Sequence, residues 1–205
     1  MSEVHRGVRS LLTHARNYDF VQGFLGAEYV RKVLVRDYIR PRPGMSILDV
    51  GCGTATILAH LPGVKYLGID RNSLYIDAAR AQFGSRGTFV CGDVNDAPPE
   101  VKSDTFDCIL AIGLLHHLED HEVCGLMAAG RKLLAPGGRL VTLDPCYRDG
   151  QSWFARFLID QDRGQNPRTE AGYSVLAGSV FEKVQVTLRE DLLRVPYTHL
   201  VMTCS

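Results

Sequence analysis

The segment Ser46–Thr56 constrains the fold of this chain more than any other stretch of its sequence. The apolar side chains within residues 47–50 predict a buried strand. Gly51 and Gly53 then predict a tight turn, where the backbone can approach a ligand closely. Residues 56–59 predict a short helix, whose first turn leaves backbone N–H groups without intrahelical partners. This order of elements is typical of the nucleotide-binding crevice in a doubly wound α/β sheet.

The side chain of Asp49 indicates which class of nucleotide this turn accepts. A carboxylate two residues before the first glycine would repel a pyrophosphate seated at the helix N-terminus. A dinucleotide fingerprint also needs a third glycine, and Thr56 stands in its place. Asp49 instead suits a ligand with positive charge, such as the sulfonium or ammonium group of S-adenosylmethionine.

The glycine turn is the first of five motifs that lie in order within residues 44–144. They are Leu48-Asp49-Val50-Gly51-Cys52-Gly53-Thr54, Gly68-Ile69-Asp70, Gly92-Asp93-Val94, Phe106-Asp107 through Leu115-His116-His117-Leu118, and Leu134-Ala135-Pro136-Gly137-Gly138-Arg139-Leu140. In this order and spacing the chain resembles the class I S-adenosylmethionine-dependent methyltransferases. The resemblance implies a doubly wound α/β fold, with a seven-stranded, mainly parallel, Rossmann-like sheet and an antiparallel last strand. Alternating patterns over residues 181–188 and 198–204 predict the antiparallel pair at the end of the chain.

The same resemblance implies S-adenosylmethionine as cofactor and S-adenosylhomocysteine as product. Asp70 ends the second predicted strand, where a carboxylate can accept both ribose hydroxyls. Arg71 is expected either to lie along the adenine or to be an exposed arginine at a helix start. Asp93 is expected to accept from the adenine amino group and the backbone of Val94 to meet a ring nitrogen. The full set of expected cofactor-binding residues is Tyr18, Asp49, Gly51, Cys52, Gly53, Asp70, Arg71, Asp93, Val94, Ala111 and Ile112.

Residues 1–40 are expected to form a helical lid, since N-terminal helices fold over the cofactor in similar methyltransferases. Tyr18 lies in a polar, aromatic break between two helical patterns. Its ring is a candidate contact to the sulfonium side of the ligand, because an aromatic face attracts a cation. The alternative is an aromatic side chain that packs against the sheet.

His116 and His117 are the candidate catalytic residues, because they follow the fourth predicted strand, where the methyl group should point. Histidine titrates near neutral pH, so one of them could act as a general base. The alternative is that one packs behind the cofactor and the other is exposed. His117 and His121 could share a helix face, but no third ligand is evident, so no metal site is expected. Asp144 is expected at the carboxyl end of the fifth strand, over the reaction site.

A polar insert near residues 148–180 is the part least similar to the family, and it is expected to cap the substrate pocket. Arg163 and Arg168 lie in this insert. They could bind an anionic group of the substrate, or they could be solvated loop arginines.

Length and composition limit the remaining possibilities. The 205 residues are expected to form one domain with a substantial core. A formal net charge of zero and the lack of a basic run argue against nucleic acid as a partner. No apolar stretch is long enough to span a bilayer, and residues 1–5 lack a signal-peptide pattern. Six scattered cysteines without a Cys-x-x-Cys motif indicate reduced thiols, so a cytoplasmic protein is expected.

The sequence therefore predicts a single-domain enzyme that transfers the methyl group of S-adenosylmethionine to a small molecule, most readily to a hydroxyl oxygen. Methyl transfer to nitrogen or carbon remains an alternative, as does a non-catalytic protein that keeps the cofactor fold as a scaffold. A dehydrogenase is disfavoured by the glycine turn and the last two strands. A hydrolase is disfavoured because the chain lacks a Gly-x-Ser-x-Gly elbow.

Overall fold

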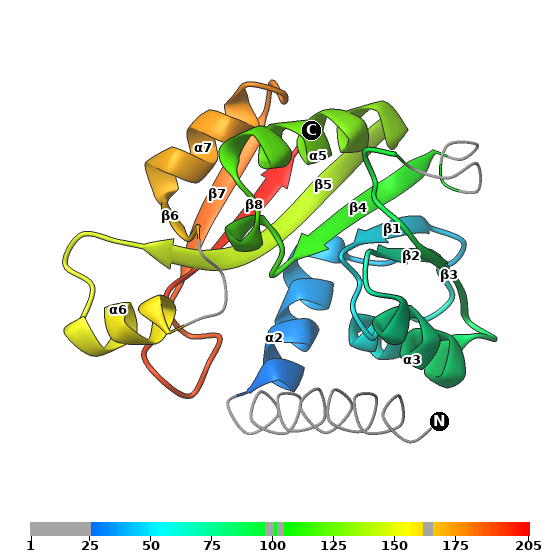
Figure 1. Ribbon diagram of the computed structural model, residues 1–205, viewed down its shortest axis with the longest axis horizontal. Helices are drawn as coiled ribbons and strands as arrows, with labels where there is room; N and C mark the ends of the chain where they lie inside the picture. Colours follow the sequence, from blue (N-terminus) through cyan, green and yellow to red (C-terminus); the bar gives the residue numbers. More distant parts are fainter. Residues whose placement is uncertain (1–25, 97–100, 102–104, 162–165) are drawn as a thin grey trace, which may run out of the picture.

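A seven-stranded sheet forms the centre of the molecule, in the order β3-β2-β1-β4-β5-β8-β7 (Figure 1). The computed structural model describes residues 26–96, 101, 105–161 and 166–205. The strands are β1 Ser46–Val50, β2 Lys65–Asp70, β3 Gly87–Cys91, β4 Phe106–Ile112, β5 Leu134–Tyr147, β7 Val184–Arg189 and β8 His199–Cys204. The first five are parallel, and β8 runs antiparallel between β5 and β7. The predicted doubly wound sheet with an antiparallel last strand is confirmed.

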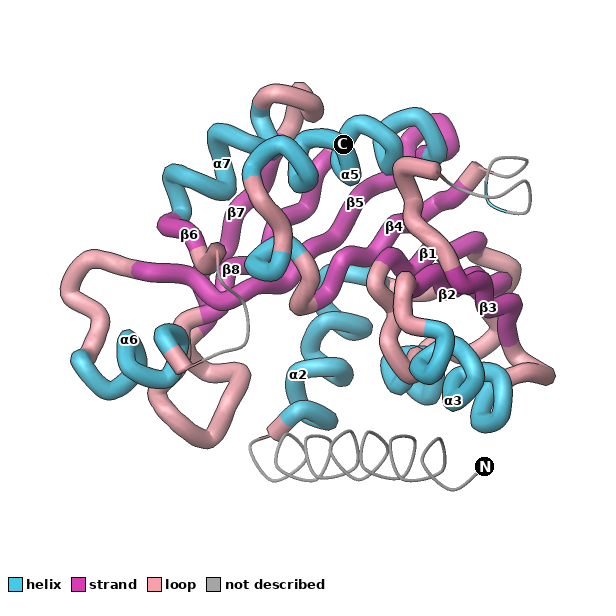
Figure 2. Tube along the Cα trace, in the orientation of Figure 1, coloured by secondary structure: helices cyan, strands magenta, loops and turns pink. Residues whose placement is uncertain are grey.

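Helices cover both faces of this sheet (Figure 2). Figure 1 shows α5 and α7 over one face and α2 and α3 over the other. The helical elements are α2 Ala27–Val33, a π-helix over Leu34–Ile39, a 3₁₀ helix over Thr56–His60, α3 Ser73–Phe83, a 3₁₀ helix over Leu115–His117, α5 Asp120–Leu133, α6 Trp153–Asp160 and α7 Glu170–Gly178. Two hydrophobic clusters result, one on each face.

The middle strands β1 and β4 are almost continuously apolar because both of their faces are covered. Ile47 and Leu110 pack in the cluster under α2 and α3, whereas Leu48 and Ile109 pack in the cluster under α5. Strand order reverses between β1 and β4, so the loops after these two strands diverge there. Ligands of open α/β sheets bind at such a point, beyond the carboxyl ends of the strands.

An eighth strand, β6 Arg168–Thr169, was not predicted. It pairs with Cys146 and Tyr147 at the carboxyl end of β5 and brings the insert to that edge of the sheet. Most of the expected N-terminal lid, with Tyr18, lies outside the described residues, as does Arg163. The lid and the role of Tyr18 stay predictions.

Candidate functional site

The glycine turn after β1 is held against the end of β2. The backbone N–H groups of Gly51 and Cys52 donate to the carbonyl of Ile69, at 2.8 and 3.1 Å. Gly51 and Gly53 have φ angles of +69° and +54°, which favour glycine. A Cβ at Gly51 would lie 2.9 Å from Leu114 Cδ1, whereas at Gly53 no atom of the described residues lies within 4 Å. Gly51 is therefore needed for packing, and Gly53 leaves open space above the turn.

Asp70 joins this turn to the end of β2. Its Oδ2 accepts from the backbone N–H of Gly53 at 2.9 Å, and its Oδ1 accepts from that of Asn72 at 2.8 Å. A carboxylate can accept about four hydrogen bonds, so two positions remain for ribose hydroxyls. The carboxylate thus orients the turn and keeps acceptor capacity at the predicted ribose position.

Asp49 is enclosed by protein rather than displayed to a ligand, with an exposure of 3%. The Tyr66 hydroxyl donates to its Oδ2 at 2.5 Å. Burial raises the pKa of Asp49 to about 7, while the bond from Tyr66 acts in the opposite direction. A direct contact between Asp49 and a cationic ligand therefore stays a prediction.

Cys52 packs over the second strand. A Cβ at Gly68 would lie 2.8 Å from Cys52 Sγ, so the glycine at position 68 makes room for the thiol. Burial raises the pKa of the Cys52 thiol, which is consequently protonated. Cys52 thus shapes the base of the turn, and its contact to the cofactor stays a prediction.

Arg71 and Asp93 form an ion pair across the ends of β2 and β3. Asp93 Oδ2 accepts from Nε and Nη2 of Arg71, and Oδ1 accepts from the backbone and side chain of Asn95. These four bonds use the acceptor capacity of the carboxylate. An adenine amino group at Asp93 would therefore have to displace one donor. The neighbouring Val94 is buried, and its contact with the adenine stays a prediction.

Ala111 and Ile112 end β4 beside the turn. Ala111 is fully buried and Ile112 half-buried, so their contacts with the cofactor stay predictions. Gly113 follows with φ +64° and donates its N–H to the carbonyl of Leu143 at 2.7 Å. The ends of β4 and β5 are thereby fixed to each other.

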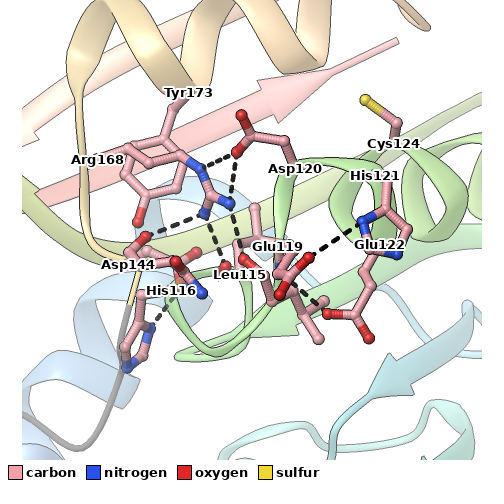
Figure 3. Close-up of polar contacts among 12 residues, drawn as sticks. Leu115, His116, Glu119, Asp120, His121, Glu122, Cys124, Asp144, Arg168 and Tyr173 are labelled. Atoms are coloured by element: carbon pink, nitrogen blue, oxygen red, sulfur yellow. Dashed lines mark hydrogen bonds and ion pairs between the residues drawn. The ribbon is translucent and has the colours of Figure 1, made fainter.

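A buried histidine–carboxylate pair lies just beyond this point (Figure 3). His116, with 4% exposure, places Nδ1 2.8 Å from Asp144 Oδ1. The same oxygen accepts the backbone N–H of His116 at 3.1 Å. Burial raises the pKa of Asp144, and its hydrogen bonds with His116 oppose this rise. With Nδ1 committed to Asp144, Nε2 is the nitrogen suited to proton transfer.

His117 differs from its neighbour, since it is exposed, although the two ring centroids lie 4.1 Å apart. One buried and one exposed histidine is the arrangement expected under the structural alternative. The general-base role stays a prediction, and the pair with Asp144 narrows it to His116. Sequence analysis placed Asp144 at this edge but gave it no partner.

Arg168 is neither an open anion site nor a solvated loop residue. Its guanidinium donates to the carbonyls of Leu115, Leu118 and Asn166 and to the Asp120 carboxylate. Only 11% of its side chain is exposed. Both sequence-based interpretations of Arg168 are therefore wrong, because the insert folds back onto the turn that carries His116.

Comparison with known proteins agrees with this geometry. Residues 47–138 match the family described as "Methyltransferase domain". "O-methyltransferase cnsE" of Penicillium expansum is 31% identical over 172 residues, which are 74% of this chain and 59% of that protein. A TehB-like S-adenosylmethionine-dependent methyltransferase structure from Corynebacterium glutamicum is 20% identical, covers 98% of both chains and has a TM-score of 0.66. The chain belongs to the class I S-adenosylmethionine-dependent methyltransferases.

The relatives also vary in kind. "Probable tRNA methyltransferase 9B" of Mus musculus is 32% identical over 112 residues, but these are 52% of the present chain and 23% of that protein. The chain thus spans less than two thirds of the length of both curated relatives named here.

A cavity of about 620 Å³ lies beside the carboxyl end of β5 in this methyltransferase. Its walls are the start of α6 and the loop between β7 and β8, and this loop is held to β5 by the bond from Cys146 N–H to the Thr198 carbonyl at 3.0 Å. The lining residues are Arg148, Gly150, Gln151, Ser152, Ala155, Glu190, Leu193, Arg194, Val195, Pro196, Tyr197 and Thr198. The cavity has no signal in the sequence, because its two walls lie about forty residues apart and neither carries a motif.

One wall of the cavity is an ordered polar chain. Gln151 Nε2 donates to the carbonyl of Cys146 at 3.3 Å and to the Thr198 hydroxyl at 2.8 Å. The Thr198 hydroxyl donates to Glu190, and Glu190 pairs with Arg148 at 3.0 Å. Apolar side chains such as Leu193 and Val195 provide much of the remaining lining. The mixture suits a small organic molecule with an apolar body and a few polar groups.

The described ranges contain no group of three or more histidine, cysteine, aspartate or glutamate residues that could hold a metal ion. Among the helices of these same ranges, none combines the length and apolar character needed to cross a bilayer.

Proposed function

We propose that this methyltransferase transfers the methyl group of S-adenosylmethionine to a hydroxyl oxygen of a small molecule, with His116 as general base. The observation that carries the proposal is the buried His116–Asp144 pair, which joins the ends of β4 and β5 beside the glycine turn. An alcohol or phenol must lose its proton during methylation, and a neutral imidazole oriented by a carboxylate is suited to take it.

The residues of the turn fit the cofactor. Gly53 leaves open space, Asp70 retains acceptor capacity, and the ends of β1 and β4 enclose the switch point. When bound, S-adenosylmethionine supplies a methyl group on a positively charged sulfur, which is a good leaving group for in-line displacement. The protein then has to align the acceptor oxygen with that methyl group and exclude water.

His116 and Asp144 provide the proton transfer. His116 Nε2 would take the proton that the acceptor hydroxyl must lose when it is methylated. Asp144 holds the Nδ1–H and stabilises the resulting imidazolium, so that the charge stays paired in a buried place. The cavity between α6 and the β7–β8 loop is the proposed seat of the acceptor's body, since it adjoins the carboxyl end of β5.

Two observations favour a small acceptor with a hydroxyl group. The relative from Penicillium expansum is described as an O-methyltransferase, which supports oxygen as the acceptor atom. The tRNA methyltransferase relative raises RNA as a rival substrate. A net charge of zero argues against RNA, since binding to a phosphate backbone relies on clustered lysine and arginine.

Radiolabelled cofactor and paired acceptors test this proposal. Phenol is compared with aniline, para-hydroxybenzoate with para-aminobenzoate, and a tRNA pool is included. Label is expected in the hydroxyl member of a pair. His116→Gln should lower kcat by about 10²–10⁴-fold, while S-adenosylhomocysteine affinity, measured by calorimetry, stays within about threefold.

His117→Gln is the matched control, because it removes an adjacent, exposed histidine of the same chemistry. It should leave kcat nearly unchanged. Transfer only to amines, or only to tRNA, would contradict the proposed acceptor. A loss below about tenfold for His116→Gln, with turnover on the hydroxyl acceptor established, would contradict the general base.

A further inference from the structure

The insert contains a segment, residues 166–173, that is bonded to His116 and to the residues that directly follow Asp144 in β5. At its start, the Asn166 N–H donates to the carbonyl of His116 at 2.9 Å. Two residues later, β6 pairs with Cys146 and Tyr147, just after Asp144 in β5. The same short segment is therefore bonded to the turn that carries the imidazole and to the strand that carries the carboxylate.

Arg168 makes the densest set of contacts in this segment (Figure 3). Its Nη1 donates to the carbonyl of Leu115 at 2.9 Å, and its Nη2 donates to that of Leu118 at 2.7 Å. These two carbonyls lie on either side of the histidine pair in the sequence. A planar guanidinium can bridge them in a fixed geometry, which the single nitrogen of a lysine cannot reproduce.

Tyr173 completes a closed circuit of contacts. It is fully buried, and its hydroxyl donates to the carbonyl of Pro145, the residue after Asp144, at 3.1 Å. The Arg168 guanidinium lies 5.7 Å from the centroid of its ring, within the range of a cation–π contact. The circuit runs from Asp144 along the chain to Pro145, then through Tyr173 and Arg168 to the Leu115–Leu118 turn, and returns through His116 to Asp144.

The charge of Arg168 is balanced by Asp120, but this carboxylate is exposed, whereas the bonds to the carbonyls are part-buried. The Asp120 carboxylate lies 2.7 Å from the guanidinium and is 73% exposed. An ion pair with such an exposed carboxylate contributes at most about 1 kcal/mol. The part-buried carbonyl bonds, which lose their donors if the guanidinium is removed, should matter more.

We propose that Arg168 is a positioning residue, which holds the Leu115–Leu118 turn so that His116 keeps its bond to Asp144. The inference rests on the proposed function only where it predicts turnover. General-base catalysis requires hydrogen-bond reach between base and acceptor, and small displacements of a catalytic group lower rates steeply. The insert thereby serves the reacting centre as well as the rim of the substrate pocket.

Arg168→Lys and Asp120→Asn, made in the full chain, separate positioning from charge pairing. The ring nitrogens and Nδ1–H of His116 are followed by NMR as a function of pH with S-adenosylhomocysteine bound, and are assigned with His116→Gln. Arg168→Lys is expected to change the His116 titration and to weaken or broaden the Nδ1–H signal. It should lower kcat on the hydroxyl acceptor by about 10–100-fold and alter its pH profile, as expected for a displaced base. Cofactor affinity should stay within about threefold, and Asp120→Asn should leave the NMR signals and kcat nearly unchanged.

Tyr173→Phe gives an independent measurement if Arg168→Lys does not fold. It keeps the ring beside the guanidinium and removes only the bond to Pro145, so a smaller change of the same sign is expected at His116. An unchanged His116 titration and pH profile in a folded Arg168→Lys or Tyr173→Phe protein, with only the melting temperature lowered, would overturn the proposal. Equal effects of Asp120→Asn and Arg168→Lys would overturn it too. The NMR measurement needs no turnover, so it decides the role of Arg168 even if His116→Gln leaves methylation intact.

Discussion

Asp49 is buried in β1 although burial of an ionised carboxylate is costly. Among the described residues the Tyr66 hydroxyl donates a hydrogen bond to this side chain, and the negative charge of Asp70 adds to the rise of its pKa. Protonation therefore offers the easiest relief of the burial cost. A cofactor with positive charge would provide another, if the predicted contact between Asp49 and the cofactor is made.

The stability of the protein should consequently depend on pH through Asp49. Its pKa is about 7 in the folded protein and 3.8 in the reference state, so the folded protein retains a proton that the unfolded chain has lost between these values. The contribution to the free energy of unfolding is present below about pH 4 and is lost as pH rises toward about 7. The loss should be on the order of a few kcal/mol.

Urea unfolding at pH 4.5 and 7.5 measures this effect. In Asp49→Asn the pH-dependent part should be largely absent, because the amide does not titrate and its oxygen still accepts from Tyr66. Asp107→Asn is the control, since the pKa of Asp107 is lowered and its titration falls below this window. Identical pH dependence in wild type and Asp49→Asn would count against a protonated Asp49.

At the scale of elements, the strand, glycine turn and short helix over residues 46–60 were predictable because their signals are local. Apolar runs gave the strands, and glycines gave the turn. β6 was not predictable, since two residues carry no periodicity and this strand exists only through its pairing with β5. Tertiary contacts override local propensity at such places.

In the candidate site, too, some features have local signals in the sequence and others exist only through tertiary contacts. Its location was predictable, because the ends of parallel strands meet at one edge. The pairings within it were not, since His116 and Asp144 lie 28 residues apart and Arg71 and Asp93 lie 22 apart. Arg168 shows the difficulty best, because sequence alone does not indicate that backbone carbonyls will be its partners.

The glycine turn permits a matched test of where the cofactor lies. Gly53 and Gly137 have φ angles of +54° and +77°, and at neither would a Cβ meet an atom of the described residues within 4 Å. Alanine at either position should cost a similar amount of backbone strain, about 1–2 kcal/mol. Gly137 lies near the start of β5, away from the carboxyl edge, so only Gly53→Ala adds an atom in the predicted ligand space.

Calorimetry with S-adenosylhomocysteine should therefore separate the two variants. Gly53→Ala is expected to weaken binding by about 10–100-fold, or about 1.4–2.7 kcal/mol, whereas Gly137→Ala should bind as wild type does. If both variants bind equally well, the ligand does not approach this turn.

At the scale of the whole molecule, the sheet places the described elements of the candidate site at one edge, while its two faces pack against helices. The clusters under α5 and α7 and under α2 and α3 share the strands β1 and β4, whose ends form the site. A ligand bound there contacts loops from both halves of the sheet. Binding should therefore stabilise the protein as one unit against unfolding.

This coupling makes thermal unfolding a test of cofactor class. A ligand that binds only the folded state at one hundred times its dissociation constant adds about 2.7 kcal/mol. For a chain of 205 residues this corresponds to a rise in Tm of roughly 5–11 °C. S-adenosylhomocysteine should produce such a rise, and NAD should not, because Thr56 stands where a dinucleotide fingerprint needs its third glycine. At the same ligand concentration the rise should shrink in Gly53→Ala and persist in Gly137→Ala. An equal rise with NAD would show that the crevice accepts a dinucleotide, and would contradict the cofactor class on which the proposed methyl transfer depends.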